Sequence, residues 1–428
     1  MSVDIVARAL GAKAGRSANT AALVAAIREY GCATRPPERL SANDIPVLTL
    51  GGAGAASTIN GNAYYLPTYN CLSPTMVYLC GPVMAAGTTS PSWNYVRARG
   101  PSYGGTSRGP GSNIAYEFIH RGSQFEIPVF GQGGPGTNLR LLVDGALAAT
   151  SAVPNGTGQG YYVKAAFPVS GTRRITVETQ GVPVNGVNVA NAGDIASTGA
   201  ARPMVTLIGD SFVEGTGAAL AEGQPLVMAR ALGLDPALAG SGGTGMLNPG
   251  TRVTFTDPER LIDLTLAGVT SVQTGAGPAD PRLGVVFGTM NDHGASPAQY
   301  SPYGATVQEA IANRTHAMID AWVAARPGRP LVFFGPTWPS GPPNNRPPLT
   351  VHAVRDGIME AAWSRSNDNV WYIDRLTPPL REGHYSITSD QASLYTGTDG
   401  THPTPLGHKL DGMSMAGALR RLILGEFA

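Results

Sequence analysis

The sequence has little charge, few aromatic residues and almost no cysteine. Of its 428 residues, 14% are charged, and the formal net charge is +1. This balance provides no basic stripe for binding nucleic acid, so we expect no nucleic-acid partner. The three cysteines, Cys32, Cys71 and Cys80, lack the spacing of a metal site, and a disulfide between Cys71 and Cys80 is left open. We therefore expect no metal.

Long apolar runs are also absent. No stretch approaches the roughly 20 apolar residues that span a bilayer, so we expect no membrane span. The N-terminus lacks the basic start and apolar core of a secretory signal peptide, which predicts a soluble protein that is not exported by the general secretory route. Neither a Walker loop nor a strand-linked dinucleotide fingerprint is present, and we expect no cofactor. The sequence does not decide between a monomer and a homo-oligomer.

Glycine and proline, in contrast, are abundant, with 56 and 35 residues. This much turn chemistry indicates many loops and a β-rich portion. The pattern divides the chain into three regions. Residues 1–112 combine a short predicted helix at 18–30 with a loop-rich segment, in which 85–112 is dense in glycine, serine, threonine and proline. Residues 113–200 and 201–428 form the second and third regions.

The second region, residues 113–200, is predicted to be an accessory β-sandwich or jelly roll. Asp144-Gly145 is a hairpin signal between apolar runs. Six short apolar or alternating runs are the expected strands: 115–120, 124–130, 139–143, 161–167, 173–179 and 187–190. Two interpretations of this domain stay open, a module that binds carbohydrate and a structural domain that packs on the rest of the protein.

The third region, residues 201–428, alternates strands with helices. Apolar residues at helical spacing predict helices around 307–322 and 351–361, and a final helix is expected at about 406–424. Four continuously apolar runs are typical of buried parallel strands: 204–208, 283–287, 331–334 and 370–373. The alternation predicts an α/β fold, a three-layer α/β/α sandwich with a parallel sheet.

Four short blocks in this third region carry the residues that matter for chemistry. The first, Gly209-Asp210-Ser211-Phe212, places a serine at the carboxyl end of a buried strand, where open α/β sheets bind their ligands. The other blocks, in chain order, are Gly240-Ser-Gly-Gly-Thr-Gly245, Gly288-Thr-Met-Asn291-Asp292 and Asp399-Gly-Thr-His402-Pro403. A serine, an imidazole and a carboxylate are the minimum set for acyl transfer through a serine ester.

Within this set we expect Ser211 to be the nucleophile, His402 the general base and then the general acid, and Asp399 the group that orients the imidazole. A serine hydroxyl attacks only when a base takes its proton. An imidazole, with an ordinary pKa of about 6.5, serves as base and as acid at neutral pH. His408 and His293 are the rival bases. His408 falls on the expected final helix and is interpreted as a packing or helix-surface histidine, whereas His293 follows Asn291-Asp292 and is a candidate to line the mouth of the site.

The four blocks in this order resemble the SGNH (GDSL-type) hydrolases, and the resemblance spans residues 201–428. It implies a flavodoxin-like fold, ester hydrolysis and three donors to an oxyanion: the Ser211 backbone N–H, a glycine N–H of the second block and the Asn291 side-chain amide. Alignment with the family's Gly-x-Thr turn selects Gly242, with Gly243 as the near alternative.

Two positions depart from the pattern of that family. Phe212 stands where leucine is usual, and an apolar residue is retained. Thr289 occupies the place of a glycine, since Gly288 lies three positions before Asn291, and this puts the shape of the loop in question. Asp210 is expected to shape the turn through hydrogen bonds rather than to titrate.

The blocks define chemistry rather than a substrate. The expected partner is a small-molecule or polysaccharide ester. Among these we favour the removal of acetyl groups from a polysaccharide or oligosaccharide, because a β-domain ahead of the hydrolase resembles the accessory modules of carbohydrate esterases. Trp338 is a candidate to stack on a sugar ring, with an ordinary packed tryptophan as the alternative, and His293 is a candidate to line the site.

Two other functions stay open. One is a lipase or arylesterase that acts on non-carbohydrate esters. The other is a phage tail receptor-binding or structural protein with a vestigial hydrolase domain, because Met1–Gly15 is faintly similar to leader segments of phage tail proteins. The complete set of serine, aspartate and histidine argues against a vestigial domain.

Overall fold

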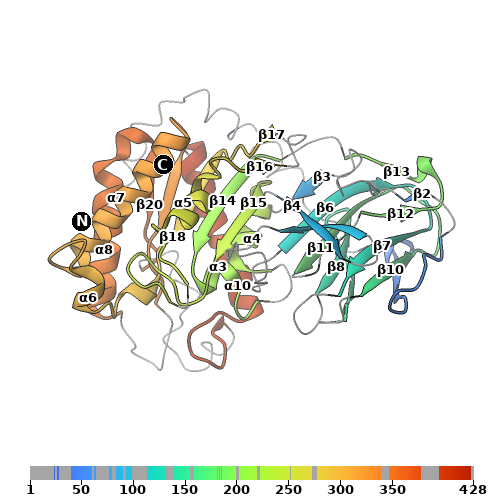
Figure 1. Ribbon diagram of the computed structural model, residues 1–428, viewed down its shortest axis with the longest axis horizontal. Helices are drawn as coiled ribbons and strands as arrows, with labels where there is room; N and C mark the ends of the chain where they lie inside the picture. Colours follow the sequence, from blue (N-terminus) through green and yellow to red (C-terminus); the bar gives the residue numbers. More distant parts are fainter. Residues whose placement is uncertain are drawn as a thin grey trace. The chain divides into compact units, whose positions relative to one another are not determined.

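In this computed structural model the chain forms two compact units (Figure 1). One contains Pro203–Val269 and Asp280–Ala428, and the other contains Ala33–Arg202 and Thr270–Ala279. Each unit is described below by itself. The structure describes Val24, Ile27, 40–59, 62–63, 77–79, 83–89, 93–98, 113–131, 138–154, 159–180, Val182, Val184, 186–198, 202–218, 222–250, 252–271, 277–338, 347–376 and 395–425.

The first unit is built on a parallel five-stranded sheet in the order β15-β14-β18-β19-β20 (Figure 1). Its strands are β14 (Met204–Gly209), β15 (Asp235–Gly240), β18 (Leu283–Phe287), β19 (Leu331–Phe334) and β20 (Val370–Ile373). The sequence predicts four of them, and the parallel α/β/α fold is confirmed. Strand β15 is missed because it contains Pro236, which a strand at the edge of a sheet tolerates.

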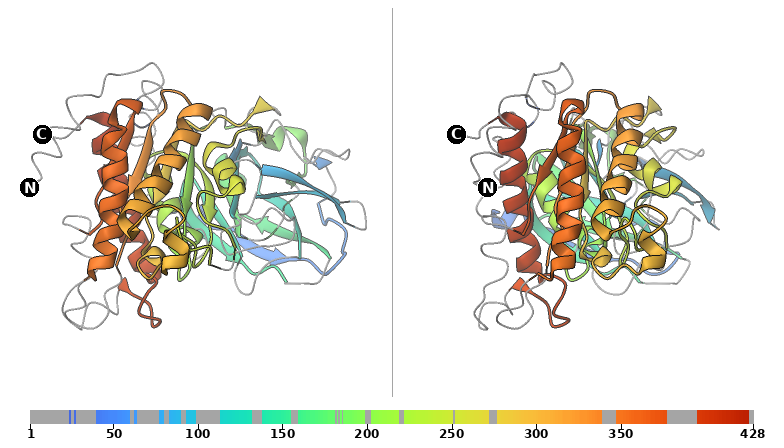
Figure 2. Two further views of the ribbon diagram at one scale, coloured as in Figure 1. Left: turned by 60° about the vertical axis from the view of Figure 1, so that its left-hand side comes forward. Right: turned by 90° about the vertical axis from the view of Figure 1, so that its left-hand side faces the viewer.

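Helices cover both faces of this sheet (Figure 2). On one face α5, α7 and α8 share a buried core with the strands, in which Trp322 packs among residues such as Ile208 and Phe333. On the other face α4 and α10 pack against each other. The helices are α4 (Gln224–Ala231), α5 (Pro258–Thr265), α6 (Pro297–Tyr300), α7 (Val307–Ala325), α8 (Leu349–Ser364), the 3-10 helix η5 (Ser366–Asp368) and α10 (Pro405–Leu424). Among the described residues, no helix combines the length and apolarity needed to cross a membrane.

The carboxyl ends of three neighbouring strands lead directly into the sequence blocks. Strand β14 leads into the short helix α3 (Ser211–Glu214), β15 into the glycine-rich loop at 241–250, and β18 into the 3-10 helix η4 (Met290–Asp292). Because parallel strands end at the same edge of a sheet, these three segments lie together. The sheet therefore brings a serine, a glycine loop and an asparagine to one place.

The second unit is a sandwich of two antiparallel sheets, in the orders β1-β10-β7-β12-β2 and β13-β6-β11-β8-β9. Both sheets contribute to one core, in which Phe118 and Val177 of one sheet pack with Phe125 and Val163 of the other. The strands are β1 (Val47–Leu50), β2 (Asn62–Ala63), β6 (Asn113–His120), β7 (Gln124–Phe130), β8 (Leu139–Val143), β9 (Ala146–Ser151), β10 (Gly160–Ala166), β11 (Arg173–Gln180), β12 (Asn188–Val189) and β13 (Ile195–Ala196).

The six expected strands of residues 113–200 are present, and the Asp144-Gly145 turn joins β8 to β9. Both turn residues have positive φ, 50° and 87°, as a type I′ hairpin requires. The remaining small elements are the 3-10 helices η1 (Ala42–Asp44) and η2 (Ala192–Asp194) and the paired strands β16 (Thr270–Ser271) and β17 (Gly277–Pro278).

Residues before 113 contribute more regular structure than the loop-rich segment expected there. Strands β1 and β2 pair with β10 and β12, and β3 (Val77–Leu79) pairs with β6, so they extend the same two sheets. Strands β4 (Val83–Thr89) and β5 (Trp93–Ala98) form a hairpin. Of the helix predicted at 18–30, the described residues Val24 and Ile27 are helical and the rest lies outside the described residues, as do all three cysteines.

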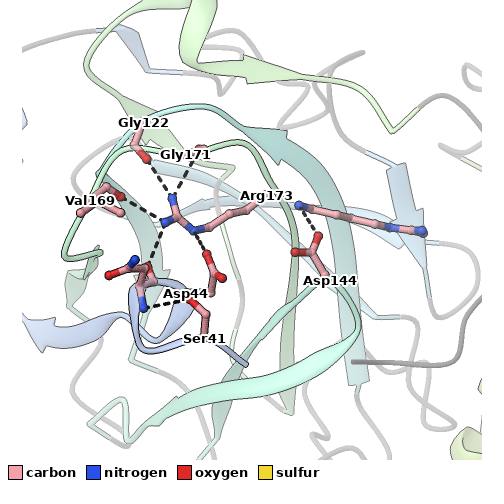
Figure 3. A network of polar contacts seen from close by, with 9 residues as sticks. Ser41, Asp44, Gly122, Asp144, Val169, Gly171 and Arg173 are labelled. Carbon is pink, nitrogen blue, oxygen red and sulfur yellow. Dashed lines mark hydrogen bonds and ion pairs between the residues drawn. The ribbon is translucent and has the colours of Figure 1, made fainter. Parts of the chain in front are cut away.

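A buried arginine fastens the N-terminal segment of this unit to the sandwich (Figure 3). The Arg173 guanidinium donates to the Asp44 carboxylate at 2.8 Å and to the carbonyl oxygens of four further residues, which are Asn43, Gly122, Val169 and Gly171. It also lies 4.2 Å from the centroid of the Phe167 ring. Because every donor of this buried cation is used, the η1 segment is held in one position.

His120, close to this arginine, is a buried histidine that stays neutral. Its Nε2 lies 3.2 Å from the Gln124 carbonyl oxygen and therefore carries the proton. Its Nδ1 is buried and has no hydrogen-bond partner among the described residues. The ring packs edge-on against Phe125 at 4.9 Å between centroids. Burial in this apolar site lowers the pKa of His120 to about 4.

The lowered pKa makes the stability of the β-sandwich depend on pH. The unfolded chain binds a proton at His120 below about pH 6.5, whereas the folded chain does not until about pH 4, so stability is full above 6.5 and falls as the pH drops. His120→Gln removes this contribution. The unfolding free energy is measured by chemical denaturation at pH 6.5 and 4.5. The loss of unfolding free energy between these two values is expected to be about 2–3 kcal/mol smaller for the variant than for the wild type. Identical pH dependences would contradict this assignment.

Candidate active site

Ser211 is the first residue of α3, at the sharp turn that follows β14. The Asp210 carboxylate caps this helix by accepting the Phe212 N–H at 2.9 Å. Gly209 is required at the turn, because a Cβ placed on it would lie 2.2 Å from a methyl carbon of Val213. The strand-to-helix turn thus presents the Ser211 hydroxyl at the carboxyl edge of the sheet.

The structure brings Ser211, His402 and Asp399 together in one chain of hydrogen bonds. Ser211 Oγ lies 2.8 Å from His402 Nε2, and His402 Nδ1 lies 2.5 Å from Asp399 Oδ2. Because Nδ1 faces a carboxylate, it carries the ring proton and leaves Nε2 to accept from the serine hydroxyl. The Phe212 ring packs beside the imidazole at 5.5 Å between centroids.

The Asp399 carboxylate also shapes the loop that carries His402. Its Oδ1 accepts the backbone N–H groups of Thr401 and His402, at 2.9 and 3.0 Å. The hydrogen bond from the His402 side chain, followed by these N–H groups, lowers the pKa of Asp399 to about 2, although the side chain is half exposed. Asp399 is therefore a carboxylate throughout the range in which the imidazole acts.

His408, the rival histidine, has a structural position. It is buried on α10, where Nδ1 accepts the Gln224 N–H at 3.2 Å and Nε2 donates to the Thr216 carbonyl oxygen at 2.9 Å. Burial lowers its pKa, so the ring is held neutral. It fastens α10 to the connection between α3 and α4, which steadies the loop of His402 just before that helix.

Asn291 is held by acceptors on two sides. Its side-chain Nδ2 donates to Asp210 Oδ2 at 3.2 Å and to the Thr244 carbonyl oxygen at 3.0 Å. Thr289, which stands where the sequence resemblance leads us to expect glycine, donates its hydroxyl to Asp210 at 2.5 Å and accepts the Asn291 N–H at 2.9 Å. The departure at Thr289 therefore adds a support for Asn291, a role that the sequence did not indicate.

Asp292 fixes the glycine loop at residues 246–248. Its buried carboxylate accepts the backbone N–H groups of Met246, Leu247 and Asn248 at 2.8–2.9 Å. Gly245 is required here, because a Cβ on it would lie 2.3 Å from Asp292 Oδ1. The third block thus positions the second, a contact between two chain segments that no local pattern reveals.

The expected backbone donors to the oxyanion differ in whether their N–H groups already donate a hydrogen bond. The Gly242 N–H already donates to the Glu214 carboxylate at 2.9 Å, which the sequence did not predict. Among the described residues, neither the Ser211 N–H nor the Gly243 N–H has a hydrogen-bond partner. Of the two glycines considered in the sequence analysis, Gly242 therefore already uses its N–H in a hydrogen bond, and Gly243 does not.

The two candidate substrate-binding residues contact each other. The His293 and Trp338 rings lie edge to face with their centroids 5.1 Å apart. His293 Nδ1 lies 2.5 Å from the Met290 carbonyl oxygen, which leaves Nε2 as an acceptor. The Trp338 indole N–H is buried and has no partner in the described part of the chain. In the same part, no group of three or more residues is arranged to hold a metal ion.

Comparisons with known proteins give one family match and several matches in fold. The sequence at residues 207–410 matches the GDSL-like Lipase/Acylhydrolase family. A search of curated proteins gave no match.

Similar solved structures include a salicylyl-acyltransferase from a tetracycline biosynthetic pathway, with a TM-score of 0.58, 17% identity, and coverage of 82% of this chain and 97% of that one. A family two carbohydrate esterase from Clostridium thermocellum, in complex with cellohexaose, has a TM-score of 0.53, 14% identity, and coverage of 81% and 98%. An acetyl xylan esterase from Butyrivibrio proteoclasticus has a TM-score of 0.53, 14% identity, and coverage of 89% and 100%. At these identities the likeness shows a shared fold.

The Thr289 hydroxyl offers a direct test of the network around Asn291. Thr289→Val keeps the shape but removes both hydrogen bonds, leaving a buried carboxylate oxygen and the Asn291 N–H with fewer partners. Its unfolding free energy, measured by chemical denaturation, is expected to fall by about 1–3 kcal/mol. Thr289→Ser, the matched control, keeps the hydroxyl and most of the stability. If the valine variant were as stable as the wild type, the hydroxyl would not support this loop.

Proposed function

Residues 207–410 belong to the GDSL-like lipase/acylhydrolase family, which makes the protein a carboxylic ester hydrolase, and from that premise we propose that it is a serine esterase that removes acetyl groups from carbohydrates. The observation that carries the serine mechanism is the hydrogen-bonded chain of Ser211, His402 and Asp399. Its distances match those of a nucleophile, a base and a group that orients the base.

The reaction follows from the protons in this chain. Ser211 Oγ attacks the acyl carbon while its proton passes to His402 Nε2, and Asp399 stabilises the imidazolium that forms. The tetrahedral intermediate collapses, the alcohol leaves with the proton from His402, and the acyl group stays on the serine. Water then attacks that ester by the same route in reverse, which releases the carboxylic acid and restores the serine hydroxyl.

The developing oxyanion needs donors that are already in place. The Ser211 N–H is available for it among the described residues, since no acceptor there takes its hydrogen. The Asn291 amide, the donor that the family resemblance also nominates, is fixed by hydrogen bonds to Asp210 and Thr244, and it serves the oxyanion by sharing the hydrogen that it donates to the Thr244 carbonyl. A rigid amide of this kind costs little reorganisation during the reaction.

The carbohydrate part of the proposal draws on the contact between Trp338 and His293. The Trp338 indole N–H is buried and has no partner among the residues that the structure describes, which is costly, and a ligand acceptor would relieve that cost. The His293 ring that packs against this indole has Nε2 as an acceptor, because Nδ1 faces the Met290 carbonyl oxygen. A sugar hydroxyl can accept a hydrogen bond from the indole N–H and donate one to His293 Nε2, so it is a suitable ligand for this pair. The carbohydrate esterases of the same fold make an acetylated glycan the first substrate to test.

The activity is tested with p-nitrophenyl acetate, p-nitrophenyl butyrate and acetylated xylan, and acetate release is measured. The wild type is expected to prefer acetate, and Ser211→Ala to lose at least about 10³-fold in kcat, because the nucleophile is gone. Turnover that persisted in Ser211→Ala would reject the serine mechanism. A preference for butyrate and longer chains would favour a lipase or arylesterase, and the absence of any turnover would favour a vestigial domain.

The sugar contact is tested by Trp338→Phe, which keeps an aromatic ring but removes the N–H. Loss of one net hydrogen bond of about 0.5–1.5 kcal/mol is expected to raise KM for acetylated xylooligosaccharides about 2- to 12-fold. The effect on p-nitrophenyl acetate, which has no sugar hydroxyl, should be smaller. Equal effects on both substrates would mean that Trp338 packs against the site without recognising sugar.

A further inference from the structure

Arg375 is a buried cation at the carboxyl edge of the parallel sheet, and the mechanism above does not use it. It lies two residues after the end of β20 and is only 5% exposed. Its guanidinium carries five N–H donors and a permanent positive charge. Among the described residues, no oxygen accepts a hydrogen bond from it. Burying such a group without a partner is unfavourable, so the place favours a ligand that brings an acceptor.

The other three arginines that are buried in the described part of the chain all have partners. Arg140 pairs with Glu178, and Arg173 pairs with Asp44. Arg260 donates to the Gly209 carbonyl oxygen at 2.9 Å. An unpaired buried guanidinium is therefore an exception in this protein, and it occurs on the edge of the sheet that carries the catalytic residues.

The backbone places Arg375 beside the segment that carries Trp338. The Gly335 N–H donates to the Ile373 carbonyl oxygen at 2.8 Å, so the chain after β19 runs alongside the end of β20. A Cβ on Gly335 would lie 3.4 Å from the Arg375 nitrogen. Trp338 follows three residues later, and its ring contacts His293. The ends of three neighbouring strands thus contribute an imidazole, an indole and a guanidinium.

The charge of Arg375 also reaches the catalytic residues. Burial raises the pKa of Asp210, and the positive charge of Arg375 is among the influences that oppose this rise. Burial lowers the pKa of His408, and Arg375 adds to that effect. Asp210 directly precedes the nucleophile, and His408 lies on the helix that follows the loop of His402. An interaction with both groups places the guanidinium in the neighbourhood of the catalytic residues.

Asp210 nevertheless does not serve as the partner of this arginine. Its Oδ1 accepts the Phe212 N–H, and its Oδ2 accepts the Thr289 hydroxyl and the Asn291 amide. These three donors satisfy the carboxylate, and it forms no ion pair with Arg375. The two charges therefore interact only from a distance, and the guanidinium keeps its donors for another acceptor.

We propose that Arg375 binds the carboxylate of an acidic sugar, so that the glycan from which this protein removes acetyl groups contains uronic acid residues. A planar guanidinium matches the two oxygens of a carboxylate, and its single charge balances one such group. The inference rests on the proposed carbohydrate acetylesterase. It narrows the substrate from glycans in general to acidic ones, with the Trp338 N–H and His293 left for a sugar hydroxyl.

The first test uses the wild type and two forms of one substrate. Acetate release is measured from acetylated oligogalacturonides and from the same oligosaccharides after their carboxylates are converted to methyl esters. The acid form is expected to have a kcat/KM about 10- to 100-fold higher, because only a charged carboxylate pairs with the guanidinium. Equal values for the two forms, or a higher value for the methyl esters, would overturn the proposal.

Arg375→Gln removes the charge and keeps a polar side chain. Its KM for the acid form is expected to rise about 10- to 100-fold, whereas its KM for the methyl esters changes less than about 3-fold, so the preference disappears. Arg375→Lys keeps the charge without the planar fork and is expected to retain part of the preference. An equal loss on both forms would mean that Arg375 only supports the surrounding structure, and would overturn the proposal.

Arg365→Gln is the matched control. Arg365 already pairs with Asp320 and Asp368, at 2.5 and 2.6 Å, so it has no role in binding an anion here. Its substitution is expected to leave the preference for the acid form at the wild-type value. A preference lost equally in Arg365→Gln and Arg375→Gln would show a general effect of positive charge rather than a site at Arg375, and would overturn the proposal.

A measurement on the wild type alone covers the case in which Arg375→Gln does not fold. D-galacturonate and D-galactose differ at one carbon, which carries a carboxylate in the first and a hydroxymethyl group in the second. D-galacturonate is expected to inhibit p-nitrophenyl acetate hydrolysis with an inhibition constant at least about 10-fold lower. Equal inhibition would overturn the proposal.

These measurements also separate this inference from the proposed function. If the wild type releases acetate from no glycan, acidic or neutral, the proposed carbohydrate acetylesterase fails. If it releases acetate from acetylated xylan but does not prefer the acid form of the oligogalacturonides, the proposed function stands and the inference about Arg375 alone fails.

Discussion

All of the chemistry assigned to this protein depends on one hydrogen bond, between Ser211 Oγ and His402 Nε2, which joins residues 191 positions apart. Each end is held by its own local structure. The turn after β14, capped by Asp210, fixes the serine, and the loop around Asp399 fixes the imidazole. Buried His408 fastens the helix that follows this loop. The parallel sheet supplies the edge at which these parts meet.

Buried carboxylates organise the rest of the site. Asp210 accepts hydrogen bonds from the Phe212 N–H, the Thr289 hydroxyl and the Asn291 amide. Asp292 accepts hydrogen bonds from three N–H groups of the glycine loop. Burying two acids near the proposed oxyanion site is unfavourable by itself, and the burial of each is offset by the hydrogen-bond donors around it. The result is a set of peptides and amides that are fixed before substrate arrives, which is what electrostatic stabilisation of an oxyanion requires.

Much of the fold could be predicted because its strands are local apolar runs, such as 331–334, and its hairpin turn is an Asp-Gly pair. The edge strand β15 was not predicted because it contains Pro236. Strands β1, β2 and β3 were not predicted because they are short and pair with distant segments. The β4–β5 hairpin was not predicted because much of it lies in the segment 85–112, whose glycine, serine, threonine and proline content indicated a loop. In the site, the motifs nominated Ser211 and His402. The contact between Glu214 and Gly242 joins two segments through the fold, so no spacing in the sequence signals it.

The most direct measurement is to map by mass spectrometry where diethyl p-nitrophenyl phosphate reacts with the protein. A serine that a neighbouring imidazole activates displaces nitrophenolate from phosphorus and keeps the diethyl phosphoryl group. The predicted result is a single modified peptide that contains Ser211, with labelling slowed about 10²-fold or more in His402→Ala. Labelling at another residue, or labelling of Ser211 at the same rate without the imidazole, would contradict a nucleophile activated by His402.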